Sequence, residues 1–307
     1  MNVIECVPNV SEGRRLDRVA RLAAAIESVA AVKLLDRSSD AAHNRSVFTF
    51  AGNRAAIEEA SLALVAAAVK EIDLRAHRGV HPRLGAVDVV PFVPLAHATM
   101  ADAVDLARRV AREIAARFAL PVFLYGEAAT SPARTRLEDI RRGGFEGLSA
   151  KMREPAWAPD YGPPAPHPTA GATVVGARGI LVAFNVNLAT DRLSDARAIA
   201  RKVRESGGGL RSVKAMGVAL EDRGIVQVSM NLTDYKVTSV ARAFDAVSTE
   251  AGRLGVEVLE SEIVGLAPRA ALEGRPPAAL RLVDFNESRV LEQRLAESGL
   301  VERSASE

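Results

Sequence analysis

Two histidines stand four residues apart in segment 77–95, where a polar stretch gives way to a strongly apolar one. His77 and His81 have the spacing that lets two imidazoles bind one zinc ion on a helix. Pro82 disfavours helix at the residue before it, and no glutamate follows His77 as in the H-E-x-x-H motif, so we expect no metal site. The pattern leaves two interpretations. Both histidines are exposed loop residues, or one is a general acid/base, since histidine titrates near neutral pH.

Arginine and glycine residues accompany these histidines. Arg83 is suited to hold an anionic substrate, because a guanidinium group binds a carboxylate with two donors at once. Gly79 and Gly85 would let the backbone approach a ligand closely. The segment therefore combines a proton-transfer group, a cation and a permissive backbone.

A second polar group, His43–Arg45, directly precedes another apolar stretch. It is either a polar turn or a set of side chains at the same end of a sheet as His81. Asn9 and Asn187 each follow a first strand, where asparagine usually satisfies turn backbone. They could instead hydrogen-bond a flat heterocycle.

The composition excludes several classes of protein. The chain has 307 residues, 48% hydrophobic and 25% charged, with a formal charge of +2, which is typical of globular proteins and not of nucleic-acid or membrane binders. The single cysteine, Cys6, rules out an internal disulfide framework, and we expect it to fill the core. No signal peptide or apolar stretch of membrane-spanning length is visible, so we expect a cytoplasmic protein.

The hydrophobic periodicity predicts the order strand, helix, strand, strand, helix, strand twice. We expect the first set at 3–7, 16–29, 31–36, 45–52, 55–69 and 87–95, with a polar connection over 37–45. We expect the second set at 179–188, 194–206, 209–220, 224–232, 238–255 and 256–266, with Ser194 as an N-cap and Gly255 closing the last helix.

Short sequence echoes accompany this repeated order. "PNVS" at 8–11 returns as "FNVN" at 184–187, "VKLL" as "VKAM" and "GAVDVV" as "GVEVLE", each roughly 170–180 residues later. The predicted fold class is α+β, with two ferredoxin-like subdomains, a duplicated βαββαβ unit, facing each other across a substrate cleft. The predicted domains are 1–180 and 181–307.

The first half carries an addition. We expect a helix at 102–118, a strand at 121–128, and then an irregular stretch over 129–169 with one short helix near 137–142. Its proline-rich part cannot form a helix or a central strand. Trp157 and Tyr161 argue against disorder. We therefore interpret the stretch as a hinge or binding loop between the two units.

Nine segments together resemble one known family. In order they are "ECVPNVSEG", "HNRSVFTF", "HRGVHPRLGAVDVVPFVP", "VFLYGEAA", "WAPDYGP", "GATVVGAR", "VAFNVNL", "QVSMNLTDY" and "SEIVGLAP". They look like the successive motifs of the glutamate formimidoyltransferases. The resemblance covers most of the chain, from Glu5 to about residue 272, and nine motifs in order are far more specific than any one of them.

The resemblance implies a function and a set of site residues. The family transfers a formimino group from N-formimino-L-glutamate to N5 of tetrahydrofolate, the co-substrate, without a metal, in histidine breakdown. The catalytic histidine of its H-x(3)-H-P-R motif is here His81. The folate-binding loop corresponds to 162–171, which includes Gly162, Pro163, Pro168 and Gly171. Some members of the family carry a cyclodeaminase region. We expect any cyclodeaminase that acts together with this chain to be a separate polypeptide.

The chemistry of this reaction calls for further candidates. Arg45, Arg83 and Arg178 suit bidentate capture of the substrates' carboxylates, and Asn9 and Asn187 suit contacts with the pterin. Asp36, Asp40 and Asp88 are the candidates to stabilise a cationic amidine intermediate. The alternatives are formyl transfer between 5-formyltetrahydrofolate and glutamate, and folate binding without catalysis. We expect small-molecule substrates, no nucleic acid or membrane partner, and a homodimer.

Overall fold

The computed structural model describes residues 2–79 and 82–302 and contains two compact units. Unit 1 takes the chain up to Arg178 together with Ser298–Glu302, and unit 2 begins at Gly179 and runs to Glu297. Each unit has its own sheet and its own apolar core.

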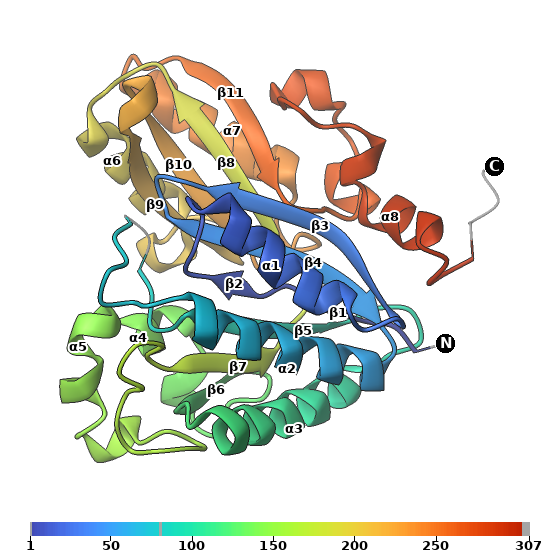
Figure 1. The fold of residues 1–307 in the computed structure, drawn as a ribbon. Coiled ribbons are helices and arrows are strands. Elements are labelled where there is room, and N and C mark those ends of the chain that lie inside the picture. The colour runs from blue at the N-terminus through green and yellow to red at the C-terminus, as the bar shows by residue number, and fades with distance from the viewer. Residues whose placement is uncertain (1, 80–81, 303–307) are drawn as a thin grey trace. The chain divides into compact units, whose positions relative to one another are not determined.

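Unit 1 is built on a seven-stranded mixed sheet (Figure 1). Its strands are β1 (Ile4–Cys6), β2 (Asn9–Val10), β3 (Val32–Asp40), β4 (Arg45–Gly52), β5 (Val87–Pro94), β6 (Val122–Gly126) and β7 (Thr173–Ala177). β1 and β2 both lie between β4 and β5, antiparallel to each, and β3 is antiparallel to the outer side of β4. β7 and then β6 extend the sheet in parallel beyond β5.

Three long helices of unit 1, α1 (Leu16–Glu27), α2 (Arg54–Glu71) and α3 (Met100–Phe118), pack against one face of this sheet (Figure 1). The apolar positions of α1 that the periodicity indicates are buried: Val19, Leu22, Ala23 and Ile26. Asn53 caps α2, and a capping box of Thr99 and Asp102 begins α3, which satisfies amide donors that the first helical turn leaves unpaired.

The other face of the sheet carries a smaller apolar cluster. Phe123 and Tyr125 of β6 and Val89 of β5 pack there against residues of α4 (Leu137–Arg141) and α5 (Gly144–Lys151). Because that face is covered locally, β5, β6 and β7 are apolar on both sides, as expected for parallel strands.

The structure corrects three of our expectations in unit 1. The polar stretch 37–45 is mainly strand, because β3 continues to Asp40 and β4 begins at Arg45, so that only 41–44 turn the chain. The stretch 129–169 holds a second helix, α5, and is followed by β7, a strand that we did not predict. Since β7 pairs with β5 and β6, the stretch 129–169 belongs within unit 1 and does not link the two units.

Unit 2 is a four-stranded antiparallel sheet in the order β11-β8-β10-β9. Its elements are β8 (Val182–Leu188), α6 (Leu193–Val203), β9 (Val213–Leu220), β10 (Ile225–Leu232), α7 (Val240–Arg253), β11 (Val258–Val264) and a final helix α8 (Leu291–Glu297). All six predicted elements of this half are present, and Gly255 follows α7 with φ +66°. The N-cap prediction was wrong: Arg192 occupies that position and Ser194 lies inside α6.

The two sheets share one pattern of strand pairing. In each unit the first strand of the βαββαβ order pairs with the third and the fourth, and the second pairs only with the third. Within the ranges that the structure describes, no helix combines the length and the apolar character that crossing a membrane requires.

Candidate active site

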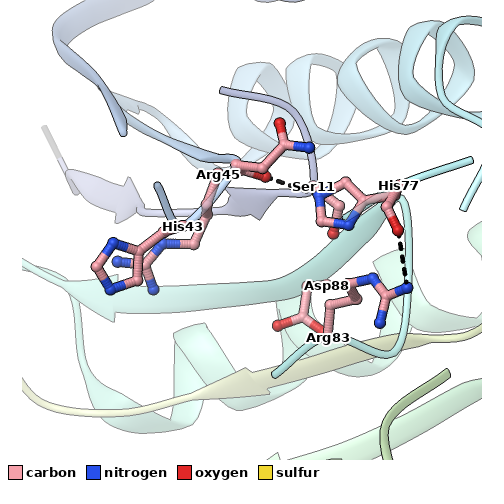
Figure 2. A pocket seen from close by; sticks show the side chains of 7 residues that line it. Ser11, His43, Arg45, His77, Arg83 and Asp88 are labelled. Atoms are coloured by element: carbon pink, nitrogen blue, oxygen red, sulfur yellow. Dashed lines mark hydrogen bonds between the residues drawn. The ribbon is translucent and has the colours of Figure 1, made fainter. Parts of the chain in front are cut away.

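A small pocket opens in unit 1 where β2 ends and β4 and β5 begin (Figure 2). Its lining residues are Ser11, His43, Asn44, Arg45, His77, Arg83 and Asp88. Its cavity volume is about 10 Å³, which is room for about one water molecule. In this form it fits a small polar group and not a pterin ring.

His77 is a buried residue of the pocket lining. It is only 4% exposed, and its Nε2 lies 2.8 Å from the carbonyl oxygen of Asn44. A carbonyl only accepts, so Nε2 carries the proton and donates. Burial lowers the pKa of His77, which favours the neutral ring. The interpretation of His77 as an exposed loop histidine is therefore wrong, because its ring is tied to the β3–β4 turn.

Asn44 holds three segments together at the tip of that turn. It adopts a left-handed conformation with φ 48°, which asparagine tolerates better than most residues. Its Oδ1 accepts the backbone N–H of Gly13 at 3.0 Å, and its Nδ2 donates to the carbonyl oxygen of Arg78 at 2.9 Å. The β3–β4 turn is thereby fixed to the segment that leads toward His81.

His43 precedes Asn44 and pairs with Asp40. Nδ1 of His43 lies 2.7 Å from Oδ2 of Asp40, and the backbone N–H of His43 donates to Oδ1 at 2.8 Å. His43 comes from the segment that the sequence left open between a polar turn and a site, and Asp40 is the last residue of β3. The structure places His43 in the pocket wall.

Asp88 sits at a bulge in β5. Asn9 pairs with Val89 and Val10 with Val87, so Asp88 has no opposite residue on β2. A bulge re-aims a side chain, and here the carboxylate turns back to accept the backbone N–H of Leu84 at 2.6 Å. It also lies 2.5 Å from the guanidinium of Arg141. Because the guanidinium of Arg141 already neutralises the charge of Asp88, this carboxylate is a weak candidate for stabilising a cationic intermediate.

Two arginines bring positive charge to the pocket. Arg83 makes a bidentate contact with Glu146, at 2.9 and 3.2 Å, and its NH2 donates to the carbonyl oxygen of His77 at 3.3 Å (Figure 2). Burial and the nearby charge of Arg141 lower the pKa of Arg45 to about 10. An anion bound beside Arg45 would relieve this repulsion, which supports its candidacy for a carboxylate contact.

Of the loop candidates, Gly171 is the one bound most closely to the pocket wall. It bridges to Gly85, whose carbonyl oxygen accepts the Ser11 hydroxyl at 2.7 Å. A Cβ on Gly171, which has φ +70°, would lie 2.0 Å from the carbonyl oxygen of Leu84. The backbone thus requires glycine here, whatever further role the residue has.

The remaining loop candidates, Gly162, Pro163 and Pro168, precede Gly171 in the chain. Gly162 has φ +89°, and a Cβ there would meet the carbonyl oxygen of Leu120 at 2.4 Å. Pro163 is partly exposed and Pro168 is exposed. Their side chains leave a surface that a ligand could cover.

Three other candidates are not among the lining residues of the pocket. The backbone N–H of Arg178 donates to the carbonyl oxygen of Phe92, four residues beyond Asp88 and so about 13 Å along the strand. Asn9 is partly exposed, and its Nδ2 donates to the carbonyl oxygen of Val7 at 3.4 Å. Asn187 belongs to unit 2, where it contacts Glu260 at 2.8 Å.

Near Arg178 the sheet buries a carboxyl group that no sequence pattern indicated. Glu5 is 5% exposed, and burial raises its pKa to about 7 against the opposing charge of Arg178. Tyr125 shares a hydrogen bond with Arg178, and burial raises the pKa of its phenol. Cys6, next to Glu5, is a core residue as predicted, and its thiol accepts from Ser61 at 3.7 Å.

His81, the candidate acid/base, lies outside the described residues, between Gly79 and Pro82. Among the residues that are described, no group of three or more His, Cys, Asp or Glu side chains is arranged to hold a metal ion.

Two models of one known protein family match this chain. The model of the N-terminal subdomain of the formiminotransferase domain matches residues 3–178, and that of the formiminotransferase domain matches residues 183–276. This chain belongs to the formiminotransferase family. The pocket of Figure 2 lies wholly within the part that the N-terminal model matches.

Named relatives of this formiminotransferase chain span nearly its whole length. A glutamate formimidoyltransferase of Streptococcus pyogenes serotype M1 is 47% identical over 294 residues, 95% of this chain and 98% of the relative. One from Thermoplasma acidophilum is 44% identical over 304 residues, 98% and 100% of the two chains. The formimidoyltransferase-cyclodeaminase of Sus scrofa is 40% identical over 276 residues, 88% of this chain and 51% of the relative.

These findings confirm the family that the ordered motifs indicated. Sequence reasoning missed the lining residue Ser11 and two ion-pair partners of lining residues, Arg141 beside Asp88 and Glu146 beside Arg83. Neither ion-pair partner has a local signal, because each lies more than fifty residues along the chain from its lining residue. One indication was present in the sequence: Asp88 lies inside the apolar segment "VDVVPFVP", and a carboxylate that is buried there needs a partner.

Proposed function

We propose that this chain transfers the formimino group of N-formimino-L-glutamate to N5 of tetrahydrofolate, giving 5-formimidoyltetrahydrofolate and L-glutamate. The support is its 44–47% identity to two glutamate formimidoyltransferases over nearly the full chain. The proposed site is the pocket in unit 1, because it is lined by histidines and arginines and adjoins the H-x(3)-H-P-R segment.

His81 is the general acid/base of this proposal. N5 must lose a proton as it attacks the formimino carbon, and the departing glutamate nitrogen must gain one. An imidazole that titrates near neutral pH is suited to both transfers.

The arginines are proposed to hold the carboxylates of the two substrates. Arg45 is the strongest candidate, since it is partly buried near another cation, Arg141, and an anion would offset that charge. Arg83 forms an ion pair with Glu146. Because the side chain of Glu146 is 67% exposed, this pair is weak and a ligand carboxylate can replace it. Arg178, beside Glu5 on the sheet, would serve a more distant part of a substrate.

Two carboxylates remain as candidates to stabilise the cationic amidine, Asp36 and Asp40. Asp40 has a side chain that is 46% exposed, whereas that of Asp88 is 3% exposed and faces Arg141. An accessible carboxylate is better placed to meet a bound cation. We therefore favour Asp40 over Asp88.

The fold that we propose is a duplicated ferredoxin-like unit with domains 1–180 and 181–307 facing each other across a substrate cleft. The shared strand-pairing pattern of the two sheets supports the duplication. In this proposal Asn9 and Asn187 contact the pterin, and 162–171, with Gly162, Pro163, Pro168 and Gly171, contributes to folate binding. Tetrahydrofolate is a co-substrate, and no metal takes part.

We further propose a cytoplasmic homodimer whose product passes to a separate cyclodeaminase. The single, buried cysteine suits a reducing compartment. Co-purification and sedimentation of the native protein would test the partner and the dimer.

The experiment is a paired assay of wild type and His81→Ala with formiminoglutamate and tetrahydrofolate. We expect the wild type to form product and the variant to lose about 100-fold or more in kcat. Equal rates would remove His81 from its role. Product from 5-formyltetrahydrofolate and glutamate alone would favour formyl transfer, and tight folate binding without turnover would favour a binding protein.

A further inference from the structure

The imidazole of His77 is hydrogen-bonded at only one of its two nitrogens. Nε2 donates to the carbonyl oxygen of Asn44 at 2.8 Å, so Nδ1 of the neutral ring carries a lone pair and can only accept. Nδ1 is buried, and among the residues that the structure describes none hydrogen-bonds it. A buried acceptor without a partner costs free energy, so a ligand N–H group that reaches Nδ1 gains a hydrogen bond that the protein itself does not supply.

The surroundings of the ring favour this acceptor form. Burial lowers the pKa of His77, and the charge of Arg83 adds to this effect, against the hydrogen bond to Asn44. The guanidinium of Arg83 is close, because its NH2 donates to the carbonyl oxygen of His77 at 3.3 Å. A proton on Nδ1 would place a second cation beside that guanidinium.

Ser11 contributes a second acceptor to the same pocket (Figure 2). Its hydroxyl donates to the carbonyl oxygen of Gly85 at 2.7 Å, which leaves only lone pairs on Oγ. Ser11 and His77 are only 3% and 4% exposed. Both line a cavity of about 10 Å³, so the two acceptors border a space that holds about one water molecule.

The terminal nitrogen of a formimino group is suited to this space. It is about the size of a water molecule and carries one or two hydrogens, which it can donate to Nδ1 of His77 and Oγ of Ser11. The oxygen of a formyl group has a similar size and carries no hydrogen. At the same position the formyl oxygen would set its lone pairs against those of the two acceptors, and both would stay unsatisfied.

Arg83 suits another part of the same substrate. In N-formimino-L-glutamate the α-carboxylate is only a few bonds from the terminal nitrogen of the formimino group. Arg83 lines the pocket with His77, and its buried Nε is a donor that no residue in the described ranges hydrogen-bonds. One small pocket thus combines an acceptor for the formimino nitrogen with a cation for a carboxylate.

We propose that His77 is a specificity-determining residue of this site, an inference that rests on the proposed function. Nδ1 of His77 accepts a hydrogen bond from the terminal nitrogen of the formimino group, and Oγ of Ser11 accepts a second one. The bond between Nε2 and the carbonyl of Asn44 fixes the ring orientation. No proton moves to or from His77. Its lone pair selects a formimino group over a formyl group.

The test compares two ligands that differ only at the group in question, N-formimino-L-glutamate and N-formyl-L-glutamate. Titration calorimetry of the full chain gives the Kd of each ligand without turnover. His77→Gln places an amide nitrogen as many bonds from the backbone as Nε2, which keeps the donor to Asn44 and removes Nδ1. We expect His77→Gln to bind the formimino ligand about 10-fold more weakly and the formyl ligand within about twofold of wild type.

His77→Asn is the converse variant. Its amide lies as many bonds from the backbone as Nδ1 and can present an oxygen there, but it is too short to reach the carbonyl of Asn44. We expect it to keep the preference for the formimino ligand and to lower Tm by about 2–4 °C. His97→Asn is the control for both measurements, because His97 is exposed and has φ 58°, which asparagine tolerates.

The outcomes separate this inference from the proposed function. If folded His77→Gln weakens both ligands by the same factor, or neither, His77 is only structural and the inference alone is overturned. If His77→Gln does not fold, the wild type decides: Kd values within about twofold of each other overturn the inference, and a stronger preference for the formimino ligand supports it. A wild type that neither binds formiminoglutamate nor turns it over with tetrahydrofolate overturns the proposed function, and this inference with it.

Discussion

The carboxylate of Asp88 lies 2.5 Å from a guanidinium nitrogen of Arg141, and the two side chains are only 3% and 16% exposed. Asp88 comes from the bulge in β5, and Arg141 is the last residue of α4. The pair thus ties the added helical segment of unit 1 to the strand that borders the pocket.

Arg141→Met is expected to lower the free energy of unfolding by about 3 kcal/mol, because it leaves the buried charge of Asp88 without its partner. Urea denaturation measures this change. The double variant with Asp88→Asn is expected to recover part of the loss. Arg142→Met is the control, since Arg142 is 80% exposed and its contact with Asp139 is worth little. Equal losses for Arg141→Met and Arg142→Met would contradict the prediction.

Glu5→Gln is expected to make the protein more stable at high pH. Burial raises the pKa of Glu5 from 4.5 to about 7, so the folded state favours the neutral carboxyl. Its contribution to stability is fully present below about pH 4.5 and is lost as pH rises through 7. The free energy of unfolding of the variant should therefore increasingly exceed that of wild type as pH rises, by up to about 3 kcal/mol at pH 8.

Chemical denaturation at several pH values between 4.5 and 8 measures the gain of Glu5→Gln. Glu27→Gln, at the exposed end of α1, serves as the control. A difference from wild type that stays constant over this range would show that Glu5 is ionised in the folded protein throughout.

Asn44→Ala is expected to destabilise unit 1 by about 2–3 kcal/mol, since it removes two hydrogen bonds and places alanine in a left-handed conformation. The bonds are those to Gly13 and Arg78. Asn231→Ala is the control, because Asn231 is exposed on β10. Thermal unfolding of both variants gives the comparison, and a matching effect at Asn231 would argue against a special role of the turn.

Gly171→Ala is expected to lower the free energy of unfolding by about 3 kcal/mol. The positive φ of Gly171 and the neighbouring carbonyl oxygen of Leu84 both exclude a Cβ. Gly147→Ala is the matched control. Gly147 lies in α5 with no atom within 4 Å of the added Cβ, so alanine should stabilise the helix by about 1 kcal/mol. Opposite signs in denaturation experiments would confirm the distinction, and equal signs would refute it.

The sequence by itself determined the family, the α+β class and most of the elements. Strong periodicity in α1 and in the strands of unit 2 carries this information locally, because the buried face repeats with the period of the element. The nine ordered motifs identified the family before any geometry was known. The prediction failed in 129–169, where short helices and the following β7 depend on packing against β5 and β6 more than on local pattern.

Only the tertiary structure decided which side chains meet. The partners of Asp88, Arg83 and His77 are Arg141, Glu146 and the carbonyl of Asn44, which lie between 33 and 63 residues away in the chain. The pairing of Asp40 with His43 is local, yet its place in the pocket wall depends on the fold that brings the β3–β4 turn to His77 and Arg78. Burial and ion pairing are set by these distant contacts, so no sequence pattern within one segment could supply them.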